Sequence, residues 1–292
     1  MNAPPPVAVI TGASGYLGSR ICATLESRGW HVVRLGRSPV KGSPWVRYDL
    51  AAPVSAEVRR VLQSADLLVH AAYDLSLTST VDIWRVNVEG TRRLLEVASS
   101  ARLRRVLVLS SMSAFAGTTQ LYGRAKLDIE AMTVAAGGCA VRPGLVYGER
   151  SGGMAGALGK LVRLPIVPII GGDARQYTVR EDDLMTALGA LAAAETLPPG
   201  TVGVAHSTAV TFRSLLVGFA AQQERRCHLV PIPWHLVYLM LRIGESLRLR
   251  LPFRADSLLG LVHTAPGVTG TDTLTRLGVT LRAFNPTAVG GG

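Results

Sequence analysis

Lysine is nearly absent from this chain. Among 292 residues there are 31 cationic side chains, and only Lys41, Lys126 and Lys160 are lysines. The formal net charge of +11 is scattered over small arginine clusters, and no basic run alternates with aromatic residues. We therefore expect no nucleic-acid partner, because such partners select a continuous basic surface. A lysine kept in an arginine-rich chain suggests a need for an ammonium that can tune a neighbouring group.

Cysteine is also scarce. Cys22, Cys139 and Cys227 are odd in number and lack the spacing of metal ligands, so we expect neither a disulfide framework nor a metal site. Free thiols indicate a reducing compartment, which predicts a cytoplasmic protein. The first six residues contain no basic segment followed by an apolar one, so they do not resemble a signal peptide.

No apolar run is long enough to cross a membrane. The longest charge-free apolar stretch near the C-terminus covers 13 residues, Leu229–Leu241, and contains two prolines. The expected role of this apolar segment is to cover a small-molecule substrate and to pair two subunits in a homodimer. The alternative is a weak peripheral membrane contact, because apolar surface beside Arg248, Arg250 and Arg254 suits a lipid interface.

Aromatic residues make up only 5% of the chain, whereas hydrophobic residues reach 48% and Ala, Leu, Val and Gly are abundant. This composition is typical of an α/β protein with a buried parallel sheet. The length predicts one large domain or two intimate ones.

A glycine-rich turn follows the first predicted strand. The apolar run Val7–Ile10 leads into Thr-Gly-Ala-Ser-Gly-Tyr-Leu-Gly, residues 11–18, and then into a helical pattern. In this context Gly12 permits a tight turn, Gly15 lets the backbone approach a pyrophosphate, and Gly18 lets helix and strand pack closely. The pyrophosphate charge would lie at the helix N-terminus.

Acidic residues are absent between His31 and Asp49, where the second predicted strand ends. An acid at this position would bind the ribose 2′-hydroxyl of NAD, whereas an arginine accommodates the 2′-phosphate of NADP. Arg37, with Arg34 as a helper, therefore predicts NADP(H), and NAD is the alternative cofactor. The competing interpretation is that Arg37 is a solvated loop residue.

Tyr122 and Lys126 are four residues apart and predict a shared helix face. We expect the ammonium to lower the pKa of the phenol by favouring the phenolate. Ser111, at the end of the predicted strand Val106–Leu109, would hold a carbonyl or alcohol oxygen while Tyr122 transfers a proton. Ser110 and Ser113 compete for this hydroxyl role. The alternative is that the helix contains this tyrosine and this lysine by chance, without a catalytic role.

These motifs occur in the order found in the short-chain dehydrogenase/reductase superfamily, and the chain resembles its extended or atypical branch, the epimerase/dehydratase-like enzymes. The resemblance covers roughly residues 7–190. It rests on the glycine turn, His70-Ala71-Ala72, Asn87-x-x-Gly90-Thr91, the serine–tyrosine–lysine segment and Arg142-Pro143-x-x-Val146-Tyr147-Gly148. A lone histidine at a buried strand end, such as His70, is more often structural, and this family has its acid elsewhere, so we do not expect His70 to be the base.

The resemblance implies further site residues. Asn87 would help to position Lys126 through water, completing a catalytic set with Ser111 and Tyr122. The expected cofactor contacts are Gly12, Gly15, Tyr16, Leu17, Gly18, Arg37, Asp49, Leu50, Ala71, Ala72, Tyr122, Lys126, Pro143 and Val146. The expected substrate contacts are Tyr73, Ser111, Met112 and Arg175, the last as a partner for a phosphate. For Asp49 the alternative is a turn residue.

The chain departs from the family at one place. Tyr122 follows Ser111 by only 11 positions, and Phe115 occupies the position of a family tyrosine. We expect this short loop to change the substrate contacts more than the proton transfer.

The expected fold is a Rossmann-type doubly wound parallel sheet with a small, mainly helical C-terminal substrate lobe. The cofactor domain would span 1–150 and the lobe 151–292, with 169–192 returning to the sheet. Asp182 and Asp183 are expected to cap a helix through Leu191, and closing helices are expected at 256–259 and within 275–284.

The expected function is an NADP(H)-dependent ketoreductase or epimerase acting on a nucleotide-linked sugar. The alternatives are a reductase of a lipophilic carbonyl compound and a non-catalytic NADP-binding scaffold or redox sensor. Relatives of the last kind usually lack the tyrosine or the lysine, and this chain has both.

Overall fold

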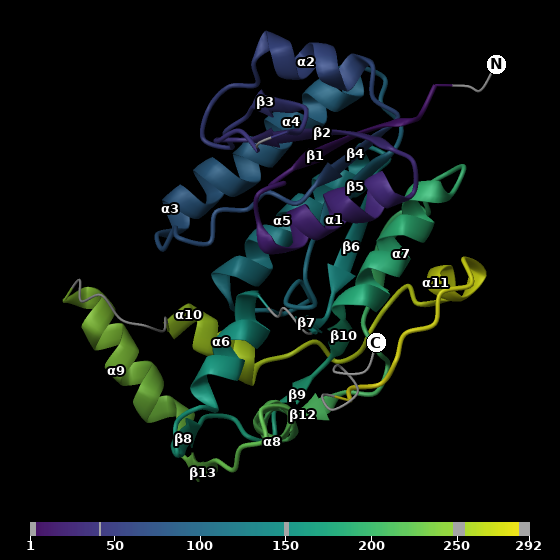
Figure 1. Cartoon of the computed structure of the whole chain (residues 1–292). Coiled ribbons are helices and arrows are strands. Elements are labelled where there is room, and N and C mark those ends of the chain that lie inside the picture. The colour runs from purple at the N-terminus through teal and green to yellow at the C-terminus, as the bar shows by residue number, and fades with distance from the viewer. Residues whose placement is uncertain (1–3, 41, 149–151, 248–254, 286–292) are drawn as a thin grey trace.

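A seven-stranded parallel sheet forms the centre of the computed structural model, which describes residues 4–40, 42–148, 152–247 and 255–285 (Figure 1). The strand order is β11-β6-β5-β4-β1-β2-β3, and every neighbouring pair is parallel. The strands are β1 (Val7–Thr11), β2 (His31–Gly36), β3 (Trp45–Arg47), β4 (Leu67–His70), β5 (Val106–Leu109), β6 (Cys139–Pro143) and β11 (Gly200–Val204). The predicted Rossmann-type doubly wound fold is confirmed.

The sheet is buried on both faces because its strands are apolar at successive positions. In β1, Ala8 and Ile10 face one helical layer, whereas Val9 faces the other. The first layer contains α1 (Tyr16–Ser27) and α7 (Glu181–Ala193). The second contains α2 (Ala56–Gln63), α4 (Glu89–Ser100) and α5 (Leu121–Ala135). A short α3 (Thr80–Ile83) and a π-helical turn, η1 (Trp84–Val88), precede α4.

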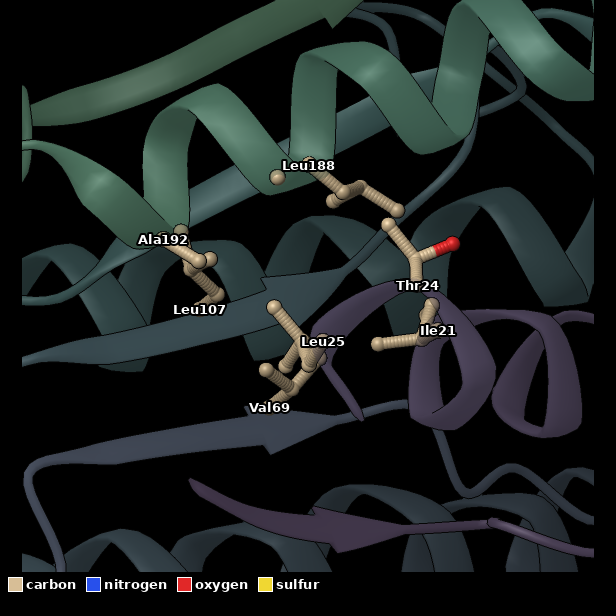
Figure 2. Close-up of a pocket in the computed structure, with 8 residues that line it drawn as sticks. Ile21, Thr24, Leu25, Val69, Leu107, Leu188 and Ala192 are labelled. Atoms are coloured by element: carbon tan, nitrogen blue, oxygen red, sulfur yellow. The ribbon is translucent and has the colours of Figure 1, made fainter. Parts of the chain in front are cut away.

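The layer of α1 and α7 is closely packed. Figure 2 shows Ile21 and Leu25 of α1 facing Leu188 of α7, with Val69 and Leu107 of the sheet beside them. The void between them measures about 10 Å³. That space is about the minimum for one water molecule and its walls are apolar, so it is a packing defect rather than a ligand site.

The segment 169–192 returns to the sheet as helix α7, and a later segment supplies the seventh strand. Strand β11 pairs with β6 and follows α7, so the sheet extends into residues that we had expected in the substrate lobe. Residues 169–192 also contain β9 (Arg175–Gln176) and β10 (Thr178–Arg180), which form small sheets outside the main one.

The C-terminal lobe has its own core, built from helices and three two-stranded sheets. Its helices are α6 (Gly153–Leu161), α8 (Phe212–Gln222), α9 (Trp234–Ser246) and α10 (Ala255–Val262). The two-stranded sheets pair β10 with β7 (Leu145–Tyr147), β9 with β12 (Val210–Thr211), and β8 (Ile166–Ile169) with β13 (His228–Pro231). Buried Val167, Ile169, Leu215 and Phe219 form its centre.

Two predictions about the C-terminal part are wrong. Between 275 and 284 the chain is helical only to Arg276, where α11 (Asp272–Arg276) ends. Asp182 and Asp183 do not cap α7, because the helix already begins at Glu181. Both acids lie in its first turn, where the helix dipole favours negative charge.

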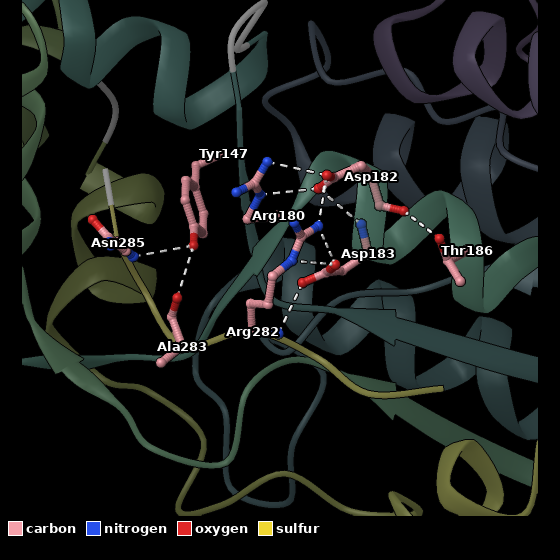
Figure 3. A network of polar contacts seen from close by, with 8 residues as sticks. All are labelled: Tyr147, Arg180, Asp182, Asp183, Thr186, Arg282, Ala283 and Asn285. Carbon is pink, nitrogen blue, oxygen red and sulfur yellow. Dashed lines mark hydrogen bonds and ion pairs between the residues drawn. The ribbon is translucent and has the colours of Figure 1, made fainter. Parts of the chain in front are cut away.

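The segment after α11 is instead a strap held by a polar network (Figure 3). Asp183 accepts hydrogen bonds from the Arg282 backbone N–H and from its Nε, both at 2.9 Å, and Asp182 pairs with the same guanidinium at 2.6 Å. The Tyr147 hydroxyl donates to the Ala283 carbonyl at 3.3 Å. Side-chain contacts thus replace the helical hydrogen bonds that we had expected there.

Within the described ranges, no helix has the length and apolar character needed to cross a membrane.

Candidate active site

The glycine turn packs against the end of β4. Gly12 has a φ of +66°, and a Cβ there would lie 2.8 Å from the backbone of Ala71 and Ala72. The Thr11 hydroxyl oxygen accepts hydrogen bonds from the N–H groups of Ala71 and Ala72 at 3.1 and 3.2 Å. Because β1 and β4 are the strands at which the order of connections reverses, this turn lies at the sheet's switch point, where doubly wound folds bind ligands.

The N-terminus of α1 fits a dinucleotide phosphate. Its N-cap is Gly15, which is exposed and offers no side-chain hydrogen bond to the first-turn N–H groups. A Cβ on Gly15 would lie 3.1 Å from the Gly12 carbonyl oxygen and otherwise occupy the approach to these groups. A bare, uncapped helix start of this kind suits an anion. Gly18 is buried against Gly12, where a Cβ would lie only 2.0 Å from the carbonyl oxygen.

His70 is structural, as expected. Its Nε2 lies 2.9 Å from the Thr91 hydroxyl, whose own hydrogen is donated to the Asn87 carbonyl, so the imidazole N–H must be on Nε2. Nδ1 therefore accepts from the Thr11 hydroxyl at 2.7 Å. Burial, followed by the charge of Lys126, lowers the pKa of His70 to about 3. The ring is neutral and fully hydrogen-bonded, which leaves it no free site for general-base chemistry.

Asn87 is fully buried in η1 and holds the loop that follows β4. Its Oδ1 accepts from the Asp74 N–H at 2.7 Å, and its Nδ2 donates to the Asp74 carbonyl at 3.2 Å. The contact therefore fixes the position of Tyr73. A role for Asn87 in positioning Lys126 through water stays a prediction.

Lys126 joins α5 to the end of β5. The ammonium donates a hydrogen bond to the Leu109 carbonyl at 2.6 Å and is 5% exposed. It lies 4.6 Å from the ring centroid of Tyr73 and 5.8 Å from that of Tyr122. Burial lowers the pKa of Lys126 to about 8, and the carboxylate of Glu130 opposes this shift. The amine thus remains largely protonated at pH 7 but titrates far below an ordinary lysine.

The expected lowering of the Tyr122 pKa is wrong in this structure. Burial raises the pKa of Tyr122 to about 12, and a hydrogen bond with Ser111 lowers it only in part. The physical reason is that desolvation disfavours the phenolate, while the Lys126 ammonium points at the Leu109 carbonyl rather than at the phenol oxygen. The Tyr122 ring packs edge-to-face on Tyr73 with centroids 5.1 Å apart.

The two competing serines, Ser110 and Ser111, have different hydrogen-bond partners. The Ser110 hydroxyl donates to Glu130, which also accepts from Arg142 Nε at 2.7 Å. Ser110 also lines the cavity described below, but its hydroxyl hydrogen is donated to Glu130 and not to Tyr122. The Ser111 hydroxyl instead accepts from the Ser113 N–H at 3.1 Å and bonds with Tyr122. This geometry favours Ser111 as the hydroxyl that accompanies Tyr122.

A cavity of about 480 Å³ opens in front of Tyr122 and Ser111. Of the predicted site residues it brings together Tyr16, Leu17, Ser111, Met112, Tyr122, Pro143 and Val146. Arg175 is exposed on β9 and is not among the lining residues, so the position predicted for a substrate phosphate lies outside the cavity. Tyr73 lies behind Tyr122 rather than on the cavity wall.

The cavity also contains residues that sequence reasoning missed. Asp256 of α10 accepts a hydrogen bond from the Leu121 N–H at 2.6 Å and thereby caps α5 one residue before Tyr122. Gln120, Tyr177 and His263 line the same cavity. The only available signal was an acid at the start of a short apolar helix, and nothing in the sequence connects it to a helix 135 positions earlier.

The residues predicted to select the cofactor lie in different environments, and not all of them are available to a ligand. Arg34 is buried and forms an ion pair with Glu26 of α1 at 2.7 Å, so it is not available as the helper that we had expected. Arg37 is exposed just beyond β2. Asp49 accepts from the Ala51 N–H at 3.0 Å, which is a turn contact, and the Leu50 carbonyl accepts from Arg93 at 2.7 Å.

Arg37 lies near the Asp74 loop. Hydrogen bonding from Ser76 lowers the pKa of the Asp74 carboxyl, and the charge of Arg37 lowers it further. The guanidinium is therefore close to the switch point where β1 and β4 meet.

A family model described as the NAD dependent epimerase/dehydratase family matches residues 8–165, more than half of the chain. The chain belongs to this family. The predicted resemblance is thus confirmed, and with it a place among enzymes of the NAD-dependent epimerase/reductase type. The match spans the glycine turn, the serine–tyrosine–lysine segment and the start of the C-terminal lobe.

Two reductases are among the similar proteins. A ceramide reductase of Caulobacter vibrioides is 27% identical over 237 residues, which cover 78% of this chain and 74% of the relative. A 4-hydroxy-2-methyl-3-oxo-4-farnesyl-3,4-dihydroquinoline-1-oxide ketoreductase of Stigmatella aurantiaca is 27% identical over 267 residues, covering 82% and 79%.

The solved structures show the shared epimerase-type fold. MoeE5 in complex with UDP-glucose and NAD has a TM-score of 0.72 at 22% identity, with 97% of this chain and 96% of that chain covered. The UDP-glucose 4-epimerase of Thermus thermophilus, in complex with NAD, has a TM-score of 0.72 at 18% identity, with the same two coverages.

Proposed function

We propose that this protein is an NADP(H)-dependent reductase of a lipophilic ketone. The observation that carries the proposal is the Tyr122 hydroxyl, joined to Ser111, at the wall of a largely apolar 480 Å³ cavity with Lys126 buried behind it. This arrangement can deliver one proton to a carbonyl oxygen bound in the cavity.

The proton transfer follows from the protonation states of the site. NADPH, if bound at the switch point, would supply the hydride for the carbonyl carbon. The Tyr122 O–H donates its proton to the carbonyl oxygen, and the Ser111 hydroxyl donates a hydrogen bond to the same oxygen. The positive charge of Lys126 stabilises the phenolate that Tyr122 becomes, and solvent then returns the proton. A Tyr122 pKa of about 12 keeps the acid protonated before each turnover.

Several residues fit the cofactor. The uncapped α1 N-terminus with Gly15 would hold the pyrophosphate, and Leu17, Pro143 and Val146 line the cavity beside it. Arg37 stands free of any carboxylate ion pair in the described residues and would bind the 2′-phosphate of NADP. NAD, which lacks this phosphate, would gain nothing from Arg37.

The cavity favours a lipophilic substrate over a nucleotide-linked sugar. Among the described residues, no arginine or lysine lines it, whereas a sugar nucleotide brings a pyrophosphate that requires cationic or multiple N–H partners. Leu75, Leu145, Met154 and Leu261 lie on its walls. The names of the ceramide reductase and the farnesyl-dihydroquinoline ketoreductase give apolar substrates, in agreement with these walls.

The nucleotide-sugar hypothesis remains as the second candidate. It is favoured by the likeness of the whole fold, lobe included, to UDP-sugar epimerases, although that likeness extends to the fold alone. The two candidates differ in the charge of the substrate, so the same assay separates them.

The test is NADPH oxidation by the wild type with a panel that contains long-chain ketones, short water-soluble ketones and UDP-sugars. We expect turnover with long-chain ketones, and a loss in kcat of about 10²–10⁴ in Tyr122→Phe, the usual range for removing a general acid. NADPH affinity in that variant should stay within about twofold, because Tyr122 is only one of many expected cofactor contacts and the phosphate contacts of the glycine turn and Arg37 are unchanged.

Three other outcomes would count against the proposal. Turnover with UDP-sugars alone would favour the second candidate. NADPH binding without turnover of any substrate would favour the non-catalytic scaffold. Equal activity in Tyr122→Phe would remove Tyr122 from the chemistry.

A further inference from the structure

Helix α9 exposes a continuous apolar face. Leu236, Leu239, Met240, Ile243 and Leu247 are between 51% and 72% exposed. Their spacing of three and four residues aligns them on one side of the helix, within an arc of about 100°. In Figure 1, α9 projects at the lower left, with α10 between it and the rest of the lobe. Five large apolar side chains in one row are a surface built for contact rather than for water.

The opposite side of α9 is anchored next to the cavity. The Trp234 ring meets the His263 ring edge-on with centroids 5.8 Å apart, and Glu245 accepts from the Ala255 N–H at 2.9 Å. His263 also lines the cavity, as do Asp256, Gly260 and Leu261 of α10. Only α10 therefore lies between α9 and the cavity.

The sequence around α9 carries a net positive charge, which favours an anionic partner. From 224 to 256 it contains six arginines and three acids, Glu224, Glu245 and Asp256. On α9 itself, Arg242 and His235 border the apolar arc at a helical rotation of about 100° per residue. Two copies of this surface would bring like charges together, whereas an anionic bilayer would neutralise them and accept the apolar side chains.

We propose that this face docks the protein on an anionic lipid bilayer, from which a lipophilic ketone enters the cavity. Leu75 and Met154 line the cavity and are 70% and 42% exposed, so its rim is apolar as well. The docking rests on the apolar face of α9 and on the charge of the sequence around it, whereas the delivery of substrate rests on the function proposed above.

Docking is tested by co-sedimentation of the full chain with two kinds of vesicle, pure phosphatidylcholine and a roughly 7:3 mixture with phosphatidylglycerol. We expect binding to the mixed vesicles, weaker binding to the neutral ones, and release by added salt. Met240→Glu and Ile243→Glu should each weaken binding at least about tenfold, because each puts a charge into the apolar face. Val134→Glu is the matched control, since Val134 is an exposed apolar residue at the far end of α5 and should leave binding unchanged.

Two results would overturn the docking proposal. The first is equal vesicle binding by wild type, Met240→Glu and Val134→Glu, or no binding at all. The second is a wild-type dimer in light scattering that Met240→Glu converts to monomers, since the face would then be a subunit interface.

A kinetic arm separates docking from the proposed function. With a long-chain ketone held in mixed vesicles, Met240→Glu should raise the KM at least about tenfold, while activity on a dispersed short ketone stays at the wild-type value. If vesicle binding fails but the short ketone is reduced, only the docking is lost. If vesicles bind but no ketone is reduced, the proposed function is lost and the docking surface stands.

Discussion

The ammonium of Lys126 donates a hydrogen bond to the carbonyl oxygen of Leu109 at 2.6 Å, and this contact fixes helix α5 against the end of strand β5. Tyr122 lies one turn earlier on α5, and Ser111 follows two residues after Leu109. This buried contact thus fixes the position of Tyr122, the proposed acid, relative to Ser111. Burial of the amine at this place lowers the pKa of Lys126 to about 8.

The pH dependence of reduction should reveal the Lys126 pKa. The ammonium is the protonated form, so the stabilisation that we propose for the Tyr122 phenolate would be present below a pH of about 8 and lost as pH rises above it. Tyr122, with a pKa of about 12, remains a proton donor throughout that range. We expect kcat/KM for ketone reduction to fall with an apparent pKa near 8, measured in steady-state assays from pH 6 to pH 10. A rate that stays constant to pH 10 would contradict this role.

Stability in acid should report the buried imidazole of His70. Its folded-state pKa of about 3 lies below the unfolded value near 6.5, so between these limits the unfolded chain binds the additional proton. The contribution of neutral His70 to the free energy of unfolding is therefore fully present above about pH 6.5. It is lost as pH falls toward 3, with a slope approaching about 1.4 kcal/mol per pH unit. Urea unfolding of wild type and His70→Gln between pH 6.5 and pH 4.5 measures the difference. Equal slopes would show that His70 is protonated in the folded protein.

Cofactor selection should depend on Arg37. In Arg37→Ala the KM for NADPH should rise about 10–100-fold, the usual cost of losing a charge-assisted contact to a phosphate, while the KM for NADH changes less than about twofold. Arg59→Ala, an exposed arginine on α2, serves as the control and should leave both values unchanged. An equal rise for both cofactors would remove Arg37 from the 2′-phosphate site.

The C-terminal strap should depend on one buried carboxylate rather than on its exposed neighbour (Figure 3). The Asp183 side chain is 8% exposed and accepts from both the backbone and the side chain of Arg282, whereas the Asp182 side chain is 54% exposed. We expect Asp183→Asn to lower the free energy of unfolding by about 2–4 kcal/mol, because it leaves a guanidinium poorly paired. Asp182→Asn should cost less than about 1 kcal/mol. Urea denaturation measures both, and similar losses would contradict the ranking.

Local patterns in the sequence predicted the first half of the fold well. The strand Val7–Thr11, the glycine turn and α1 follow one another without a break, so their hydrophobic period and turn residues determine the structure locally. The same is true of Tyr122 and Lys126, whose spacing on α5 is fixed by the helical repeat. The structure brings Tyr122 and Ser111 to one cavity, as the motif predicts.

Local sequence patterns could not predict the contacts between residues that are far apart in the chain. The edge strand Gly200–Val204 is short, and its place beside β6 depends on packing across more than fifty residues. The cap of α5 by Asp256 joins residues from opposite parts of the chain. The direction of the Tyr122 pKa shift was missed because burial, which no local motif encodes, outweighs a nearby charge. The ion pair of Arg34 with Glu26 likewise depends on the packing of α1 against β2.

The transfer of deuterium from NADPH that carries deuterium at both C4 positions of the nicotinamide is the most direct test of a carbonyl reduction centred on Tyr122. The wild-type protein is incubated with the labelled cofactor and a long-chain ketone, and the alcohol is analysed by mass spectrometry. The account predicts one deuterium on the carbinol carbon with wild type and none above background with Tyr122→Phe. Alcohol without the label, or equal labelling by both proteins, would contradict it.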